Sequence, residues 1–134
     1  MGRRLLIIDN EPHICEGLRD RLEAMGYSVL VAHDGRTGLA LMALEAKQTP
    51  ITGVLLDLQM PIMDGIHVLR ELRVQHEHVP VVMMTAEPDR RVREEALSLG
   101  AKHYIVKPVD APLFAQICAQ TFPLIDQNTG DLLK

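Results

Sequence analysis

Five short, mostly apolar runs recur along the chain, and each ends at a polar residue or a turn signal. Between consecutive runs lie segments with apolar residues at helical spacing, bounded by Gly and Pro. Continuous apolar runs of about this length are typical of strands that are buried on both faces, as in parallel sheets. The pattern therefore predicts five strands, at residues 5–8, 29–32, 54–56, 81–84 and 103–106.

The intervening segments predict five helices. Pro12 suits the first turn of the first helix, where a backbone N–H is not needed, and Gly26 suits its end. The second helix is apolar almost all round, so its pattern does not select a buried face. The fourth helix is mostly charged, and we expect it to pack weakly. The five helices are predicted at residues 12–25, 36–47, 66–73, 88–99 and 110–122.

Strict alternation of strands and helices predicts the fold class. Such a chain forms an α/β domain with a parallel sheet, helices on both faces and right-handed crossovers. For five strands the usual solution is the flavodoxin-like doubly wound sheet, with strand order 2-1-3-4-5. We expect one domain over residues 1–123, followed by a polar tail or the start of a linker over residues 124–134.

Composition and charge narrow the class of protein. The 134 residues are 47% hydrophobic and 24% charged, as in an ordinary globular domain. The net charge is −4 and the 14 Lys and Arg residues are scattered, so this segment shows no electrostatic footprint for nucleic acid or an anionic membrane. No apolar run approaches the length of a membrane span. Cys15 and Cys118 are not spaced as metal ligands, and we expect both to be buried as small apolar residues. Two free thiols are typical of a reducing compartment, so we expect a cytoplasmic protein.

Polar side chains gather where the predicted strands end. Asp57 follows the third strand, and taken alone it is better explained as a carboxylate that starts a turn than as a reactive group. However, Asp9 and Asn10 follow the first strand, Thr85 the fourth and Lys107 the fifth. In the order 2-1-3-4-5 these four strands are neighbours, and the chemistry of open α/β sheets lies at their carboxyl ends. We therefore expect these side chains to converge on one edge.

The same residues carry a family resemblance. Over residues 4–122 the chain resembles the receiver domain of two-component response regulators. The resemblance rests on motifs in the family's order and spacing, namely Asp9-Asn10-Glu11, the run from Leu56 to Gly65, Met84-Thr85-Ala86, Gly100-Ala101 and Lys107-Pro108. It implies a phosphorylation-dependent signalling switch.

The resemblance assigns a role to each strand-end residue. Asp57 would accept a phosphoryl group from a phosphohistidine on a sensor histidine kinase or phosphotransfer protein. A carboxylate can be the nucleophile when the charges around it are neutralised. Lys107 and Thr85 would contact phosphoryl oxygens, and the Lys107–Pro108 peptide would be cis. Mg²⁺ would be held by the residues Asp9, Asn10, Asp57 and Gln59, the last through its backbone carbonyl.

The resemblance also implies how the state of Asp57 is transmitted. Tyr104 occupies the position of an aromatic switch that turns inward when Thr85 moves toward the phosphoryl group. The output surface would be the face formed by the fourth helix, the fifth strand and the fifth helix, on which two copies could pair. The output itself would be a separate effector or a covalently attached domain. Chemistry would be limited to phosphorylation and dephosphorylation of Asp57, so the chain is not a conventional enzyme.

One residue departs from the family pattern, and two functions other than a switch also remain open. The metal pocket normally carries two adjacent acids, and here the second is the neutral Asn10. The site is therefore expected to bind Mg²⁺ more weakly. Glu11 could compensate in part, although members of the family commonly carry an acid at this position that is not a metal ligand. One alternative is a pseudo-receiver binding module that acts without phosphorylation. The other is a phosphohydrolase with an aspartate nucleophile, although such enzymes keep an acid two residues later, where this chain has Gln59.

Overall fold

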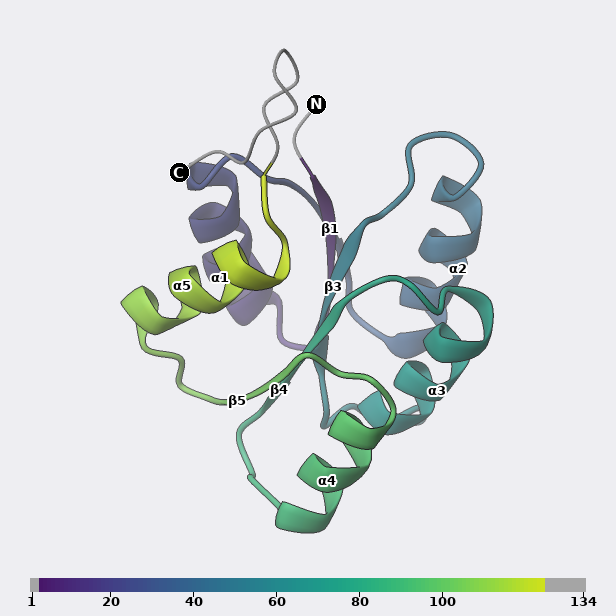
Figure 1. Cartoon of the computed structure of the whole chain (residues 1–134), viewed down its shortest axis with the longest axis vertical. Helices are drawn as coiled ribbons and strands as arrows, with labels where there is room; N and C mark the ends of the chain where they lie inside the picture. The colour runs from purple at the N-terminus through teal and green to yellow at the C-terminus, as the bar shows by residue number, and fades with distance from the viewer. Residues whose placement is uncertain (1–2, 125–134) are drawn as a thin grey trace.

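A five-stranded parallel sheet forms the centre of the molecule (Figure 1). The computed structural model describes residues 3–124. The strand order is β2-β1-β3-β4-β5, which confirms the predicted topology. The strands are β1 Arg4–Ile8, β2 Ser28–Ala32, β3 Gly53–Asp57, β4 Val81–Thr85 and β5 His103–Val106.

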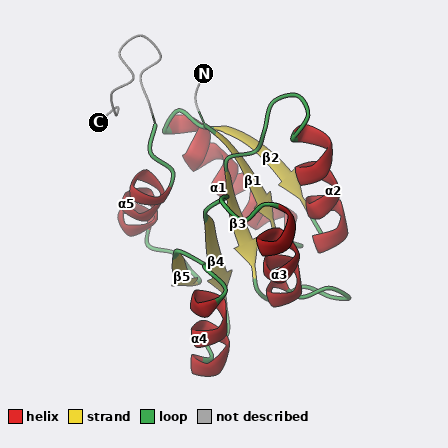
Figure 2. Ribbon diagram, turned by 45° about the vertical axis from the view of Figure 1, so that its right-hand side comes forward, coloured by secondary structure: helices red, strands yellow, loops and turns green. Residues whose placement is uncertain are grey.

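Five helices cover the two faces of this sheet. α1 and α5 lie on one face, and α2, α3 and α4 lie on the other, as both views show (Figures 1 and 2). The helices are α1 Pro12–Ala24, α2 Gly35–Glu45, α3 Gly65–Gln75, α4 Arg90–Ser98 and α5 Ala111–Thr121. Gly26 and Gly100, at φ +106° and +91°, follow α1 and α4 in the left-handed region that glycine tolerates, as expected of helix stops.

The apolar runs form two cores, one on each face of the sheet. Alternate residues of the strands point to opposite faces, so Leu6 and Leu56 join the core under α2, α3 and α4. Leu5 and Leu55 join the core under α1 and α5. Every residue of β3 and β4 is buried, whereas the edge strands β2 and β5 are only partly covered. Burial of each such aliphatic side chain stabilises the fold by roughly 1.5–3 kcal/mol.

Aspartate side chains fix the starts of four helices at the carboxyl edge of the sheet. Each accepts a hydrogen bond from a backbone N–H in the first turn of its helix, an interaction that contributes about 1 kcal/mol. The capping residues of α2, α3, α4 and α5 are Asp34, Asp64, Asp89 and Asp110. Because each cap directly follows a strand-to-helix loop, the caps hold the loops that surround the strand ends.

α4 packs weakly, as its sequence predicted. Ala96 is its only buried residue, and the other apolar members are partly exposed. The helix begins at Arg90 rather than at the predicted residue 88, because Asp89 serves as its cap and Pro88 precedes that cap. A short helix with little buried surface is an element of low local stability.

Both cysteines are buried and free. Burial raises the pKa of Cys15 to about 11 and that of Cys118 to about 12, so both are neutral thiols that pack as small apolar groups. Among the described residues, no helix has the length and apolar character needed to cross a membrane. The tail predicted for residues 124–134 lies, apart from Leu124, outside the described part of the chain.

Ile62, in the loop between β3 and α3, has an unfavourable backbone conformation. Its φ is +70°, and its side chain is fully exposed, at 100% relative accessibility. A left-handed conformation costs an L-residue about 1–2 kcal/mol, and here no packing of the side chain offsets this cost. We expect Ile62→Gly to raise the free energy of unfolding by about 1 kcal/mol, after allowing for the flexibility of glycine in the unfolded chain. Urea unfolding followed by circular dichroism measures this change.

Val74 offers a matched control. It is also β-branched and 81% exposed, but it lies within α3 and has no positive φ. Val74→Gly should therefore lower the free energy of unfolding, by about 0.5–1 kcal/mol. A loss of stability in both variants would show that Ile62 is not strained.

Candidate functional site

The sheet brings the predicted strand-end residues to one edge. Asp57 and Thr85 are the last residues of β3 and β4, and Asp9 and Lys107 directly follow β1 and β5. The register places β3 between β1 and β4, and β5 beside β4. Asp9, Asp57 and Thr85 are all buried, and such burial is unusual for the carboxylates of Asp9 and Asp57.

Lys107 connects the two buried carboxylates. Its Nζ lies 2.8 Å from Asp9 Oδ2 and 3.3 Å from Asp57 Oδ1, and only 10% of its side chain is exposed. Asp9 Oδ1 also accepts a hydrogen bond from the Glu11 backbone N–H, at 2.9 Å. The predicted cis peptide between Lys107 and Pro108 is present. One cation is thus shared by two anions inside the protein.

Burial and charge shift two pKa values at this edge. Desolvation, together with the nearby charge of Asp9, raises the pKa of Asp57, although Lys107 opposes this effect. Burial alone would lower the pKa of Lys107, but its hydrogen bond to Asp9 and the charges of Asp57 and Asp9 hold that pKa above its usual value. The ammonium therefore stays charged at neutral pH.

The carboxylate of Asp57 is held through one oxygen. Besides Lys107, its Oδ1 accepts a hydrogen bond from the backbone N–H of Gln59, at 3.4 Å. Within residues 3–124 no hydrogen bond to Oδ2 is present. Gly65 packs against the same strand end, and a Cβ there would lie 2.5 Å from the Asp57 carbonyl oxygen and 2.7 Å from Leu58 Cα. Only glycine allows α3 to start this close to Asp57.

Hydrogen bonds within the β4–α4 loop hold Thr85 and the residues after it. The Thr85 hydroxyl donates to the Glu87 carbonyl at 3.1 Å and accepts from the Glu87 N–H at 3.0 Å. The N–H of Ala86 donates to the side-chain carbonyl of Gln59, at 3.2 Å. Sequence reasoning placed Thr85 and the Gln59 carbonyl at the site but missed this side-chain contact, because no sequence pattern encodes it.

Tyr104 lies on β5 and packs against the core under α2, α3 and α4. It is partly buried, and its hydroxyl accepts a hydrogen bond from the backbone N–H of Asp89 at 3.4 Å. The ring is therefore linked to the residue that caps α4. Its role as a switch stays a prediction.

The oxygen atoms that could bind a metal suit a hard cation, but they carry less negative charge than the same positions in the family pattern. Asp9 and Asp57 supply buried carboxylate oxygens, while Asn10 is exposed and offers a neutral amide oxygen. Residues 3–124 contain no group of three His, Cys, Asp or Glu side chains that could hold a metal ion. Oxygen ligands such as the carboxylates of Asp9 and Asp57, an amide and a backbone carbonyl are of the kind that Mg²⁺ prefers.

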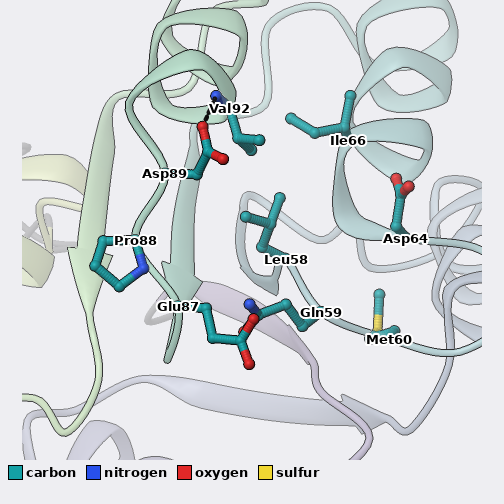
Figure 3. Close-up of a pocket in the computed structure, with 9 residues that line it drawn as sticks. All are labelled: Leu58, Gln59, Met60, Asp64, Ile66, Glu87, Pro88, Asp89 and Val92. Carbon is teal, nitrogen blue, oxygen red and sulfur yellow. Dashed lines mark hydrogen bonds between the residues drawn. The ribbon is translucent and has the colours of Figure 1, made fainter.

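A pocket of about 640 Å³ opens beside the site, between the start of α3 and the β4–α4 loop (Figure 3). Gln59 and Glu87, which follow Asp57 and Thr85 by two residues, line one end of it, and Val92 of α4 lines the opposite end. The pocket borders on the loop that connects Thr85 to α4, and movement of that loop would change its shape.

A model of a known protein family matches most of the chain. Residues 5–119 match the model of the response regulator receiver domain. The chain belongs to the response regulator receiver domain family. The resemblance predicted from the motifs is thereby confirmed, and receiver domains of this family are signalling domains rather than conventional enzymes.

Individual proteins that are similar to this receiver domain agree with the family assignment. The chain is 38% identical to the transcriptional regulatory protein CpxR of Klebsiella pneumoniae over 117 residues, which cover 87% of this chain and 48% of CpxR. It is 37% identical to the response regulator MprA of Mycolicibacterium vanbaalenii over 131 residues, which cover 98% of this chain and 54% of MprA. The chain thus spans about half the length of these relatives.

A solved structure supports the fold. A chain in the CheX–CheY–BeF₃–Mg²⁺ complex from Borrelia burgdorferi superimposes with a TM-score of 0.83 at 27% identity, covering 90% of this chain and 89% of that chain. As its name states, that complex contains a beryllofluoride group and Mg²⁺.

The raised pKa of Asp57 predicts how stability depends on pH. Between the ordinary carboxyl pKa and the raised value, the folded state binds more protons than the unfolded state, so stability falls as pH rises through that window. At pH 7 the folded protein carries the cost of the buried charge. We expect Asp57→Asn to be more stable than the wild type at pH 7, and the difference to shrink below the window. Urea unfolding from pH 3.5 to 7.5 measures both effects.

Asp34 provides a control of opposite sign. Hydrogen bonds from Thr37 lower the pKa of its carboxyl group, so its contribution to stability is present above the ordinary pKa and is lost in acid. Asp34→Asn should therefore lower stability at pH 7. If Asp57→Asn behaved in the same way, burial of the Asp57 charge would not be unfavourable.

Proposed function

We propose that this receiver domain is a phosphorylation-dependent switch in which Asp57 accepts a phosphoryl group from a phosphohistidine of a sensor histidine kinase or phosphotransfer protein. The observation that carries the proposal is the Lys107 ammonium shared by Asp9 and Asp57. It neutralises one carboxylate charge and holds Asp57 through Oδ1. Oδ2 is left as the oxygen that can react.

The transfer uses these groups in a simple displacement. Oδ2 of Asp57 attacks phosphorus, the bond from phosphorus to the donor imidazole nitrogen breaks, and its electron pair stays on that nitrogen. Catalysis of such a step comes mainly from positioning and from stabilisation of charge. Lys107 is fixed beside Asp57 for this purpose, and the Thr85 hydroxyl at the next strand end donates to a phosphoryl oxygen once it leaves Glu87. Water attack on the acyl phosphate reverses the modification.

Asp9, Asn10, Asp57 and the Gln59 carbonyl would hold Mg²⁺. When bound, this ion supplies positive charge to the phosphoryl oxygens. The burial of Asp9 and its contact with Lys107 position its carboxylate for this role. Asn10 contributes an oxygen without a negative charge, so the residues of this chain attract the cation less than a site with two adjacent acids.

The response reaches the surface through the β4–α4 loop. When Thr85 turns toward the phosphoryl group, its bonds to Glu87 break and the loop can shift, together with Tyr104 and the weakly packed α4. The output surface is the face of α4, β5 and α5. Exposed apolar side chains on it support a contact with a second copy or an effector, namely Leu97, Val106 and Leu113.

The output domain and location are also proposals. Since the chain spans about half the length of relatives such as CpxR, we propose that residues 124–134 lead toward an output domain, with residues 1–123 as the switch. Two free, buried thiols agree with a cytoplasmic setting.

Labelling with a small-molecule phosphodonor tests the nucleophile. The wild type should incorporate phosphate from radiolabelled acetyl phosphate in the presence of Mg²⁺, in a bond that hydroxylamine cleaves. Asp57→Asn should reduce the label to background, because the amide is not a nucleophile toward phosphorus. Asp64→Asn is the matched control, since Asp64 caps α3 and should keep full labelling. Label that persisted on Asp57→Asn would refute the assignment, and an unlabelled wild type would favour a binding module.

Metal affinity tests the role of Asn10. We expect Asn10→Asp to bind Mg²⁺ about tenfold more tightly than the wild type, because a full negative charge is added beside a divalent cation. Glu11→Gln should change the affinity less than Asn10→Asp does, since Glu11 can compensate for Asn10 only in part. The chain has no Trp, so isothermal calorimetry is the suitable measurement. Equal affinities of wild type and Asn10→Asp would rule out a ligand at position 10.

A further inference from the structure

Gln59 contacts both sides of the proposed reaction site. Its backbone N–H donates to Asp57 Oδ1 at 3.4 Å, and its side-chain oxygen accepts from the Ala86 backbone N–H at 3.2 Å. Asp57 ends β3, and Ala86 directly follows the adjacent strand β4. One residue therefore ties the segment after β4 to the segment after β3.

This contact occupies a donor that the modified site would need. A phosphoryl group carries about two negative charges and three strong acceptor oxygens. β4 lies beside β3, and its end offers two hydrogen-bond donors to a phosphoryl group on Asp57. These donors are the Thr85 hydroxyl and the Ala86 N–H. In the structure both are engaged by neutral acceptors, the Glu87 carbonyl and the Gln59 side chain. Neither can bind a phosphoryl oxygen until it is released.

The contact also lies at the start of a chain of hydrogen bonds that leads to α4. Ala86 is followed by Glu87, which holds Thr85, and then by Asp89. The Asp89 N–H donates to the Tyr104 hydroxyl, and the Asp89 carboxylate accepts from Arg91 and Val92 to cap α4. A group that fixes Ala86 therefore fixes the beginning of the loop that positions α4.

We infer that Gln59 is a positioning residue that holds the β4–α4 loop in its unphosphorylated arrangement, because its side chain occupies the Ala86 N–H that a phosphoryl oxygen on Asp57 would otherwise accept from. The inference rests on the proposed function of Asp57. Phosphorylation then has to displace the Gln59 side chain, and the free energy of that hydrogen bond opposes activation.

The surroundings of Gln59 allow this displacement. Its side chain lines the pocket of about 640 Å³, and Figure 3 shows it at the same end as Glu87. A carboxamide released from Ala86 can therefore enter the pocket without disturbing the core. Ala86 is exposed, so water can satisfy its N–H when Gln59 is absent.

Beryllofluoride, a non-covalent mimic of an acyl phosphate, tests the inference. Gln59→Met keeps the length of the side chain and removes the acceptor. In the presence of Mg²⁺ it should bind beryllofluoride about two- to tenfold more tightly than the wild type, the size expected for one net hydrogen bond. Titration followed by ¹⁵N–¹H NMR measures the affinity. The same spectra should show a shifted and faster-exchanging Ala86 amide in Gln59→Met before any ligand is added.

Glu87→Gln is the matched control. Glu87 lines the same end of the pocket, but within residues 3–124 its side chain makes no hydrogen bond, so this variant should keep the Ala86 amide resonance of the wild type. In wild-type protein, beryllofluoride should also shift the side-chain NH₂ resonances of Gln59. This measurement tests the displacement even if Gln59→Met fails to fold.

The outcomes separate this inference from the proposed function. If the wild type does not bind beryllofluoride, both are overturned. If the wild type binds it but Gln59→Met binds no more tightly, or if the Ala86 amide is unchanged in that variant, the phosphorylation role stands and the positioning role of Gln59 is overturned.

Discussion

The Lys107 ammonium between Asp9 and Asp57 is the interaction on which the site depends. Two carboxylates buried side by side repel each other and lose hydration, and a single cation offsets both costs only in part. The remaining cost is seen in the raised pKa of Asp57. A site that retains an excess of negative charge attracts a cation and is altered by a change of charge, which is what a phosphorylation switch requires.

The fold supplies the rigid frame for these charges. Fully buried β3 and β4 fix the strand ends, and aspartate caps fix the helices that follow. Gly65 brings the start of α3 against Asp57 at a distance that a side chain would forbid. By contrast α4 buries only Ala96. The start of α3 is held rigidly against β3, whereas α4, which follows β4, is packed weakly. A response to a change at Asp57 is therefore directed toward α4.

Strand order and the convergence of Asp9, Asp57 and Lys107 could be predicted from sequence, because apolar runs mark buried strands and parallel strands share one edge. The contact of the Gln59 side chain with Ala86 could not, because it depends on the path of two loops and on one rotamer. The positive φ of Ile62 could not be predicted either, because a β-branched residue does not indicate a left-handed turn. Local patterns report burial and period, whereas contacts between loops depend on the assembled sheet.

Asn10 changes the balance of charge in two opposing ways. A second acid at this position would strengthen the attraction for a cation, but it would add a third negative charge around Lys107 and raise the cost of the resting site. It would also repel the phosphoryl group, which brings about two negative charges to Asp57. In the proposed switch a neutral amide would therefore weaken the hold on the metal and at the same time lower the repulsion within the phosphorylated site. The departure from the family pattern is thus compatible with the proposed switch, because its electrostatic cost would fall on metal binding and its benefit on the phosphorylated state.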